Sequence, residues 1–212
     1  MMPELANLSL FVTASLALLL TPGPAVLYIV TRSVDQGRKA GLVSVLGIEV
    51  GTLFHIAAAA LGLSAILASS ALLFDAVKYL GAAYLIYLGI RKLLSKDETA
   101  QVEVARQQNL RQIFQQGVIV NVLNPKTALF FLAFLPQFVD PARGSVPLQM
   151  LMLGTIFVLL ASTTDSLYAL LAGTFGGLLK GSTRYLRAQR YVTGTVYIGL
   201  GVAAALTSSN KK

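Results

Sequence analysis

Long apolar runs separated by short charged clusters dominate the sequence. Of 212 residues, 55% are hydrophobic and only 12% are charged, against the roughly 25% charged residues of a typical soluble domain. A helix crosses the hydrocarbon core of a bilayer in about 20 residues and satisfies its own backbone hydrogen bonds there. The sequence therefore predicts an all-α integral membrane protein with six transmembrane helices. The predicted helices cover about 8–30, 40–68, 72–90, 113–139, 148–179 and 191–206.

The fifth run is longer than one crossing requires, and it contains the polar residues 162–166. Tilt, a break at these residues or an amphipathic extension could each absorb the surplus length. Residues 31–39, between the first two runs, are expected to form a polar turn.

Lysine and arginine residues gather in alternate loops. The loops after the first, third and fifth runs hold three, five and four of them, whereas the loops after the second and fourth runs hold none and one. Because cytoplasmic loops carry the excess of basic residues, the odd-numbered loops are expected in the cytoplasm and both termini outside it. This arrangement accounts for the net charge of +8, so nucleic acid is not expected as a partner.

The chain contains no cysteine and a single histidine, His55. Disulfides and thiolate metal sites are therefore excluded, and one histidine cannot form a His-rich metal site. We expect neither a metal nor a cofactor. Two roles stay open for His55, a packed or pore-lining residue and a proton relay.

Two runs are interrupted by proline motifs at corresponding places. Leu-Thr-Pro-Gly-Pro-Ala occupies residues 20–25, and Leu-Asn-Pro-Lys-Thr-Ala occupies residues 123–128. Aligning Pro22 with Pro125 also aligns the flanking leucines and alanines. Since three helices separate the motifs, the two halves would cross the membrane in opposite directions, as in a 3+3 inverted repeat. The alternative is unrelated proline kinks, which are common in transmembrane helices.

The predicted repeat divides a single domain, residues 1–212, into two halves and a connecting loop. These are repeat A at about 5–92, a cytoplasmic loop at about 93–112 and repeat B at about 113–208. A proline removes one backbone donor and crowds the preceding turn. The carbonyls freed near residues 18–21 and 121–122 then need partners, and a substrate ammonium or an ion in a water-filled cavity could serve.

Three charged residues, Glu49, Lys126 and Asp165, lie deep within apolar runs. Each costs about 2.5–3.5 kcal/mol at a helix centre on insertion scales, so we expect all three to face the bundle interior. The simplest arrangement pairs Lys126 with Asp165 or Glu49 and leaves one carboxylate over. Because burial disfavours the charged form of a carboxyl group, Glu49 or Asp165 could carry a proton. The alternative is a buried salt bridge that only fixes helix register.

Glycines flank one of these charges. Gly47 and Gly51 are four residues apart around Glu49, which is the spacing that lets two membrane helices approach closely. The same spacing would let a substrate reach the backbone, but we expect packing to be its role.

An intramembrane enzyme is the rival class of protein. Ser64 and His55 share one predicted helix nine residues apart, which is too far for a Ser–His hydrogen bond. The sequence also lacks a Gly-rich phosphate loop and a paired acidic metal motif. We therefore expect no enzyme, and a membrane scaffold or receptor that does not transport is the remaining alternative.

The combined motifs resemble the LysE/RhtB superfamily of bacterial amino-acid exporters. The matching segments are residues 21–25, 47–51, 78–89 and 121–126, and length and helix count agree across the chain. The resemblance implies a bacterial inner-membrane transporter that exports an amino acid or derivative of the homoserine, threonine, leucine or lysine class by proton antiport. Its partners would be that substrate, protons and the lipid bilayer, with a homo-oligomer left open. Export of another small polar metabolite is the alternative.

The resemblance also implies a translocation path lined by the first break and the 124–126 turn. The family pattern that the chain resembles has an acidic position in the second helix, which is often aspartate in relatives. Glu49 occupies this position here. With the buried charges added, the expected path residues are Thr21, Pro22, Gly23, Pro24, Glu49, Asn121, Asn124, Pro125, Lys126 and Asp165. For a zwitterionic substrate, Lys126 and backbone donors near Gly23 would hold the carboxylate, and Glu49 or Asp165 would hold the ammonium. Glu49, Asp165 and His55 are the candidates for proton coupling.

Overall fold

A computed structural model describes residues 5–63 and 108–179, with scattered helical positions between 76 and 94 and between 191 and 205. Every regular element within these residues is helical, which confirms the predicted all-α class. The predicted third and sixth helices and most of the loop between the two halves lie outside the described residues.

Two described helices, Pro24–Gly62 and Val146–Phe175, are long and apolar enough to cross a membrane. Leu110–Val122 and Pro125–Phe138, bent by 44° at their junction, form a third candidate span, and Asn7–Leu20 is a shorter apolar helix. Helices of this length and composition are those of a membrane protein.

The first predicted interruption is present. Helix α1 (Leu5–Leu20) ends before the proline motif, and helix α2 (Pro24–Ala58) begins within it. Pro24 takes the first turn of α2, where no intrahelical partner is available for a backbone N–H. Gly23 precedes it in an extended conformation, and its carbonyl accepts the N–H of Leu27 at 2.9 Å.

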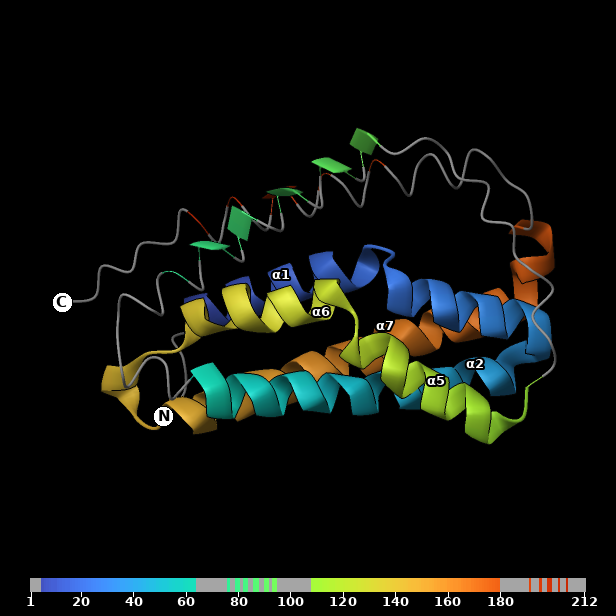
Figure 1. Cartoon of the computed structure of the whole chain (residues 1–212), viewed down its shortest axis with the longest axis horizontal. Coiled ribbons are helices and arrows are strands. Elements are labelled where there is room, and N and C mark those ends of the chain that lie inside the picture. The colour runs from blue at the N-terminus through green and yellow to red at the C-terminus, as the bar shows by residue number, and fades with distance from the viewer. Residues whose placement is uncertain are drawn as a thin grey trace.

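Helix α2 folds back on itself at Gly37, whose φ of +82° is rarely adopted by residues with a side chain. Tyr28, before the reversal, donates a hydrogen bond to the Ile113 carbonyl, and Gly47, after it, lies against the Phe114 carbonyl. In a straight helix, residues 28 and 47 would be about 28 Å apart. Because both contact neighbouring residues, the two legs of α2 must lie side by side, as Figure 1 shows.

This reversal corrects a predicted boundary. Residues 31–39 are helical except for Gly37, so the expected nine-residue polar turn is wrong and the reversal is confined to one glycine. The predicted first membrane helix therefore consists of α1 and the first leg of α2. The second leg continues into the π-helix η1 (Ala59–Leu63), in agreement with the predicted second helix as far as it is described.

The second predicted interruption is also present. The chain there forms helix α5 (Leu110–Val122), helix α6 (Pro125–Leu129), the π-helix η2 (Phe130–Phe134) and the 3₁₀-helix η3 (Leu135–Phe138). A capping box of Asn109 and Gln112 starts α5. Pro125 again takes the first helical turn after the break, and the Asn124 side chain accepts the N–H of Lys126 at 3.1 Å.

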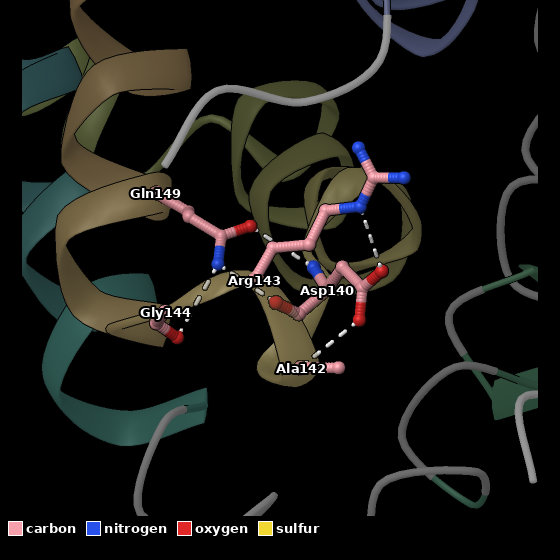
Figure 2. Close-up of polar contacts among 5 residues, drawn as sticks. All are labelled: Asp140, Ala142, Arg143, Gly144 and Gln149. Carbon is pink, nitrogen blue, oxygen red and sulfur yellow. Dashed lines mark hydrogen bonds and ion pairs between the residues drawn. The ribbon is translucent and has the colours of Figure 1, made fainter.

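A short connection containing the 3₁₀-helix η4 (Pro141–Arg143) leads into helix α7 (Val146–Leu179). Figure 2 shows how the buried side chain of Gln149 holds it: the amide oxygen accepts the Asp140 N–H at 3.0 Å, and the amide nitrogen donates to the Asp140 carbonyl at 2.8 Å. Arg143 pairs with the Asp140 carboxylate at 3.3 Å. These contacts fix the turn from η3 into α7.

Helix α7 is continuous over 34 residues, so the break considered at residues 162–166 is wrong. The hydroxyl groups there bond to carbonyls of their own helix and leave its backbone ladder intact. Thr163 donates to Leu159 at 2.8 Å, and Thr164 donates to Leu160 at 3.0 Å.

The described helices form a bundle with two distinct ends. At the first, which we call the Gly37 end, the reversal of α2 meets the start of α5, where Gln36 and Gln108 exchange hydrogen bonds. Helix α7 finishes at the same end, on the right of Figure 1. At the opposite end, called the Phe138 end, Phe11 of α1 packs edge-on against Phe138 with ring centroids 5.3 Å apart.

The second leg of α2 and helix α5 approach to backbone contact along three glycines. A Cβ atom at Gly47 would meet the carbonyl of Phe114, and one at Gly51 would lie 2.7 Å from the Cβ of Asn121. Gly117 faces the carbonyls of α2 in the same way, since a Cβ there would lie 3.0 Å from one of them. The spacing of Gly47 and Gly51 therefore serves close packing, as predicted.

We predict that Gly47→Ala lowers the stability of the folded protein by about 1–3 kcal/mol, the usual cost of overpacking. Gly62→Ala is the matched control, because a Cβ there meets no atom of the described residues within 4 Å. Unfolding by SDS, followed by circular dichroism, measures both variants. Equal stability of the two variants would contradict the backbone contact.

Candidate functional site

A small cavity lies between the two helix breaks, the second leg of α2 and helix α7. Its volume is about 30 Å³, which is enough for one or two water molecules and too little for an amino acid. We call this conformation closed, because the space is too small for a solute. Its lining residues are Leu18, Leu19, Gly23, Ala25, Val26, Ile48, Glu49, Thr52, Asn121, Asn124, Lys126, Thr127, Phe157, Ala161 and Asp165.

Three buried charged side chains, Glu49, Lys126 and Asp165, line this one cavity from three different helices. Within the described residues, both carboxylate oxygens of Glu49 and Oδ1 of Asp165 are buried without a hydrogen-bond partner. Buried ionised groups without partners are costly. The cavity therefore holds unmet capacity to bind a cationic group or a proton.

Lys126 makes no direct ion pair with either carboxylate in the described part of the chain, so the predicted direct pairing is wrong. Its charge still acts on Asp165 at longer range. Its ammonium group instead donates a hydrogen bond to the carbonyl of Thr21 at 2.5 Å. In an unbroken helix, that carbonyl would accept the N–H of residue 25, but the extended Gly23 interrupts the helix there. The break in the first half thus supplies the partner for the buried cation of the second half.

Asn121, at the end of α5, is the centre of a polar network beside the cavity. Its amide nitrogen donates to the Ile48 carbonyl and to the Thr52 hydroxyl, both at 2.8 Å. Its amide oxygen accepts from Asn124 at 3.2 Å and from the Thr127 hydroxyl at 3.0 Å. These bonds use both donors and both lone pairs of the side chain and tie the second break to the second leg of α2.

The structure separates the predicted path residues into two groups. Gly23, Glu49, Asn121, Asn124, Lys126 and Asp165 line the cavity. Thr21, Pro22, Pro24 and Pro125 shape the breaks without lining it, and the two helix-starting prolines, Pro24 and Pro125, are exposed on the outside of the described bundle.

His55 lies outside the cavity lining. Its Nε2 atom is 2.8 Å from the Asn121 carbonyl, and because a carbonyl can only accept, this nitrogen must carry the hydrogen. The ring stacks on Phe131 with an interplanar angle of 9°. Tyr168, which the sequence did not single out, makes a comparable contact, because its hydroxyl donates to the Leu20 carbonyl at 2.9 Å.

Several other lining residues were not predicted from the sequence, although their spacing from the buried charges indicates them. Phe157 and Ala161 precede Asp165 by eight and four residues, which places all three on one face of α7, and Thr52 follows Glu49 by three residues on α2. Positions three or four apart on a helix share a face. Extending this spacing along each helix from its buried charge predicts Phe157, Ala161 and Thr52 as lining residues.

These features define a helical membrane protein in which two broken helices and two long helices enclose a charged cavity. The chain belongs to the LysE type translocator family, whose family model matches residues 16–208. Members of this family are transporters, so the protein is a transporter and not an enzyme.

Curated relatives cover nearly the whole chain. A membrane protein of Bacillus subtilis (strain 168), YrhP, whose function is uncharacterised, is 29% identical over 95% of this chain and 99% of its own length. An uncharacterised membrane protein of Vibrio cholerae is 30% identical over 88% of this chain and 90% of its own. A homoserine/homoserine lactone efflux protein of Salmonella typhimurium is 29% identical over 92% of this chain and 94% of its own. No solved structure matches the chain.

We predict that Asn121→Leu destabilises the fold, because it leaves buried partners of the amide without hydrogen bonds. Each such group costs about 1–3 kcal/mol. Thr155→Val is the control, since among the described residues that hydroxyl bonds only to the Leu151 carbonyl of its own helix, at an exposed position. Unfolding in SDS should separate the two variants, and comparable stability would show that the network around Asn121 is dispensable.

Proposed function

We propose that this protein exports a small amino acid or amino-acid derivative, of the homoserine, threonine, leucine or lysine class, in exchange for protons. The observation that carries the proposal is the placement of Glu49, Lys126 and Asp165 on one closed cavity between two helix breaks. Membership of a translocator family and a relative named as a homoserine/homoserine lactone efflux protein support it.

The proposed binding mode follows from the charges. A zwitterion carries one carboxylate and one ammonium group. Lys126 would exchange the Thr21 carbonyl for the substrate carboxylate, and Glu49 or Asp165, whose buried oxygens have no partner among the described residues, would take the ammonium. The cavity would have to widen well beyond 30 Å³ to admit such a solute.

The remaining carboxyl group would carry the proton. When the substrate leaves, an ionised carboxylate in a closed apolar cavity is unfavourable, and uptake of a proton removes its charge. Proton binding at this carboxyl group and ammonium binding at the other would then alternate within one cavity. This alternation is the basis of the proposed antiport.

We further propose six transmembrane helices arranged as two inverted three-helix repeats, at about 5–92 and 113–208. In support, both described breaks begin their second helices with a proline, Pro24 and Pro125. The first break packs against α7 of the other half through Leu20 and Tyr168, and the second packs against α2 through Asn121 and His55. Rocking of one repeat against the other would expose the cavity to each side in turn.

The Gly37 end is proposed to face the cytoplasm of a bacterial inner membrane, with both termini on the periplasmic side. Arg32, Arg38 and Lys39 surround the reversal at this end. Helix α5 begins and helix α7 finishes here, and the basic segments after the third and fifth predicted helices are the sequence neighbours of these two helix ends. Excess basic residues mark the cytoplasmic side.

We predict that Glu49→Gln and Asp165→Asn have different effects on export. The substitution at the proton carrier should flatten the pH dependence of export. The other should weaken substrate binding by about tenfold or more, because a hydrogen bond to a charged group contributes about 1.5–3 kcal/mol. Proteoliposomes loaded with labelled amino acids under an imposed proton gradient provide both readouts. If both variants export with unchanged rate and pH dependence, the proposed coupling is wrong.

A further inference from the structure

Each helix break contains a carbonyl that a proline leaves without its regular partner. Pro24 has no N–H to give to the Leu20 carbonyl, and Pro125 has none to give to the Asn121 carbonyl, since a helical N–H bonds to the carbonyl four residues before it. The Leu20 carbonyl accepts a hydrogen bond from the Tyr168 hydroxyl at 2.9 Å. The Asn121 carbonyl accepts one from the His55 ring nitrogen at 2.8 Å and a second from the backbone N–H of Asn124 at 3.0 Å. Both side-chain donors come from a helix in the other half of the chain.

These two contacts lie on opposite sides of the cavity. The second leg of α2 runs away from the Gly37 end, and His55 follows the cavity residue Glu49 by six residues, about 9 Å toward the Phe138 end. Helix α7 runs the other way, and Tyr168 follows Asp165 by three residues, about 4.5 Å toward the Gly37 end. The Tyr168–Leu20 contact therefore lies toward the Gly37 end, to which the first broken helix continues as α2. The His55–Asn121 contact lies toward the Phe138 end, to which the second broken helix continues as α6.

We propose that His55 and Tyr168 are positioning residues that hold the two breaks closed, and that each releases its carbonyl when the cavity opens at its own end. Loss of the Tyr168–Leu20 contact would open the Gly37 end, and loss of the His55–Asn121 contact would open the Phe138 end. This inference rests on the proposed transport function, and it assigns His55 a role other than proton relay.

The surroundings fit contacts that break and re-form. Neither His55 nor Tyr168 lines the cavity, so a solute bound there would not displace either side chain from its carbonyl. Lys126 and the Asn121 amide, in contrast, hold the breaks from within the cavity lining. His55 and Tyr168 are only partly buried, and they can exchange the carbonyl for water when an end opens.

Side-specific labelling of a single cysteine tests the proposal, and the chain supplies a cysteine-free background. Ala161→Cys places the reporter in the cavity lining. A membrane-impermeant thiol reagent is applied from the cytoplasmic side in inverted vesicles and from the periplasmic side in spheroplasts. Tyr168→Phe removes only the hydroxyl. His55→Leu removes the ring donor, and His55→Gln retains an N–H donor.

Tyr168→Phe should raise labelling from the cytoplasmic side, and His55→Leu should raise it from the periplasmic side. Each increase should be about two- to tenfold, as expected for one lost neutral hydrogen bond, and His55→Gln should remain close to the parent. Opposite shifts with the sides interchanged would support the contacts and reverse the proposed topology. Shifts to the same side, no shift in folded protein, or equal behaviour of His55→Gln and His55→Leu would overturn the proposal.

Export of labelled homoserine and threonine by the parent is measured in the same vesicles. Absence of export would refute these two substrates, whereas the labelling comparison would still decide whether His55 and Tyr168 control the two ends.

Discussion

The ammonium group of Lys126 donates a hydrogen bond to the carbonyl of Thr21, and this contact joins two broken helices from opposite halves of the chain. Both groups are almost fully buried, so neither can turn to bulk water. A carbonyl without its helical partner and a cation without a carboxylate would each be unfavourable alone. Together they stabilise the closed cavity, and they leave Glu49 and Asp165 with unmet bonding capacity.

Helix breaks give the described helix bundle a polar interior. Backbone groups that a continuous helix would consume become available at the two proline motifs, and side chains of neighbouring helices bind them: Lys126, Tyr168 and His55. Such bonds can be exchanged for others of similar strength. A closed site built from exchangeable bonds, in a member of a translocator family, suits a cycle in which substrate, proton and protein donors replace one another.

The sequence predicts the two helix breaks at the proline motifs, because proline chemistry is local. It does not predict that the reversal of α2 needs only Gly37. It also predicts three buried charges, since hydropathy locates Glu49, Lys126 and Asp165 within apolar runs. It does not predict the burial of Arg32, which lies in the segment expected to be a polar turn. It does not predict the partner of Lys126, because the choice between a carboxylate and a freed carbonyl depends on helix rotation and distance. The sequence does not predict the role of Tyr168 for a similar reason. A tyrosine in an apolar helix resembles an interfacial residue, and only the structure shows that its hydroxyl donates to the Leu20 carbonyl.

Binding of labelled homoserine and threonine to the purified protein tests most directly whether the charged cavity is the substrate site. We expect Lys126→Ala to weaken binding by about tenfold or more, because the substrate carboxylate would lose a charged hydrogen bond. Arg143→Ala should bind normally, since Arg143 lies outside the cavity lining and pairs with Asp140. Unchanged affinity in folded Lys126→Ala protein would show that the carboxylate is held elsewhere and that the charged cavity is not the substrate site.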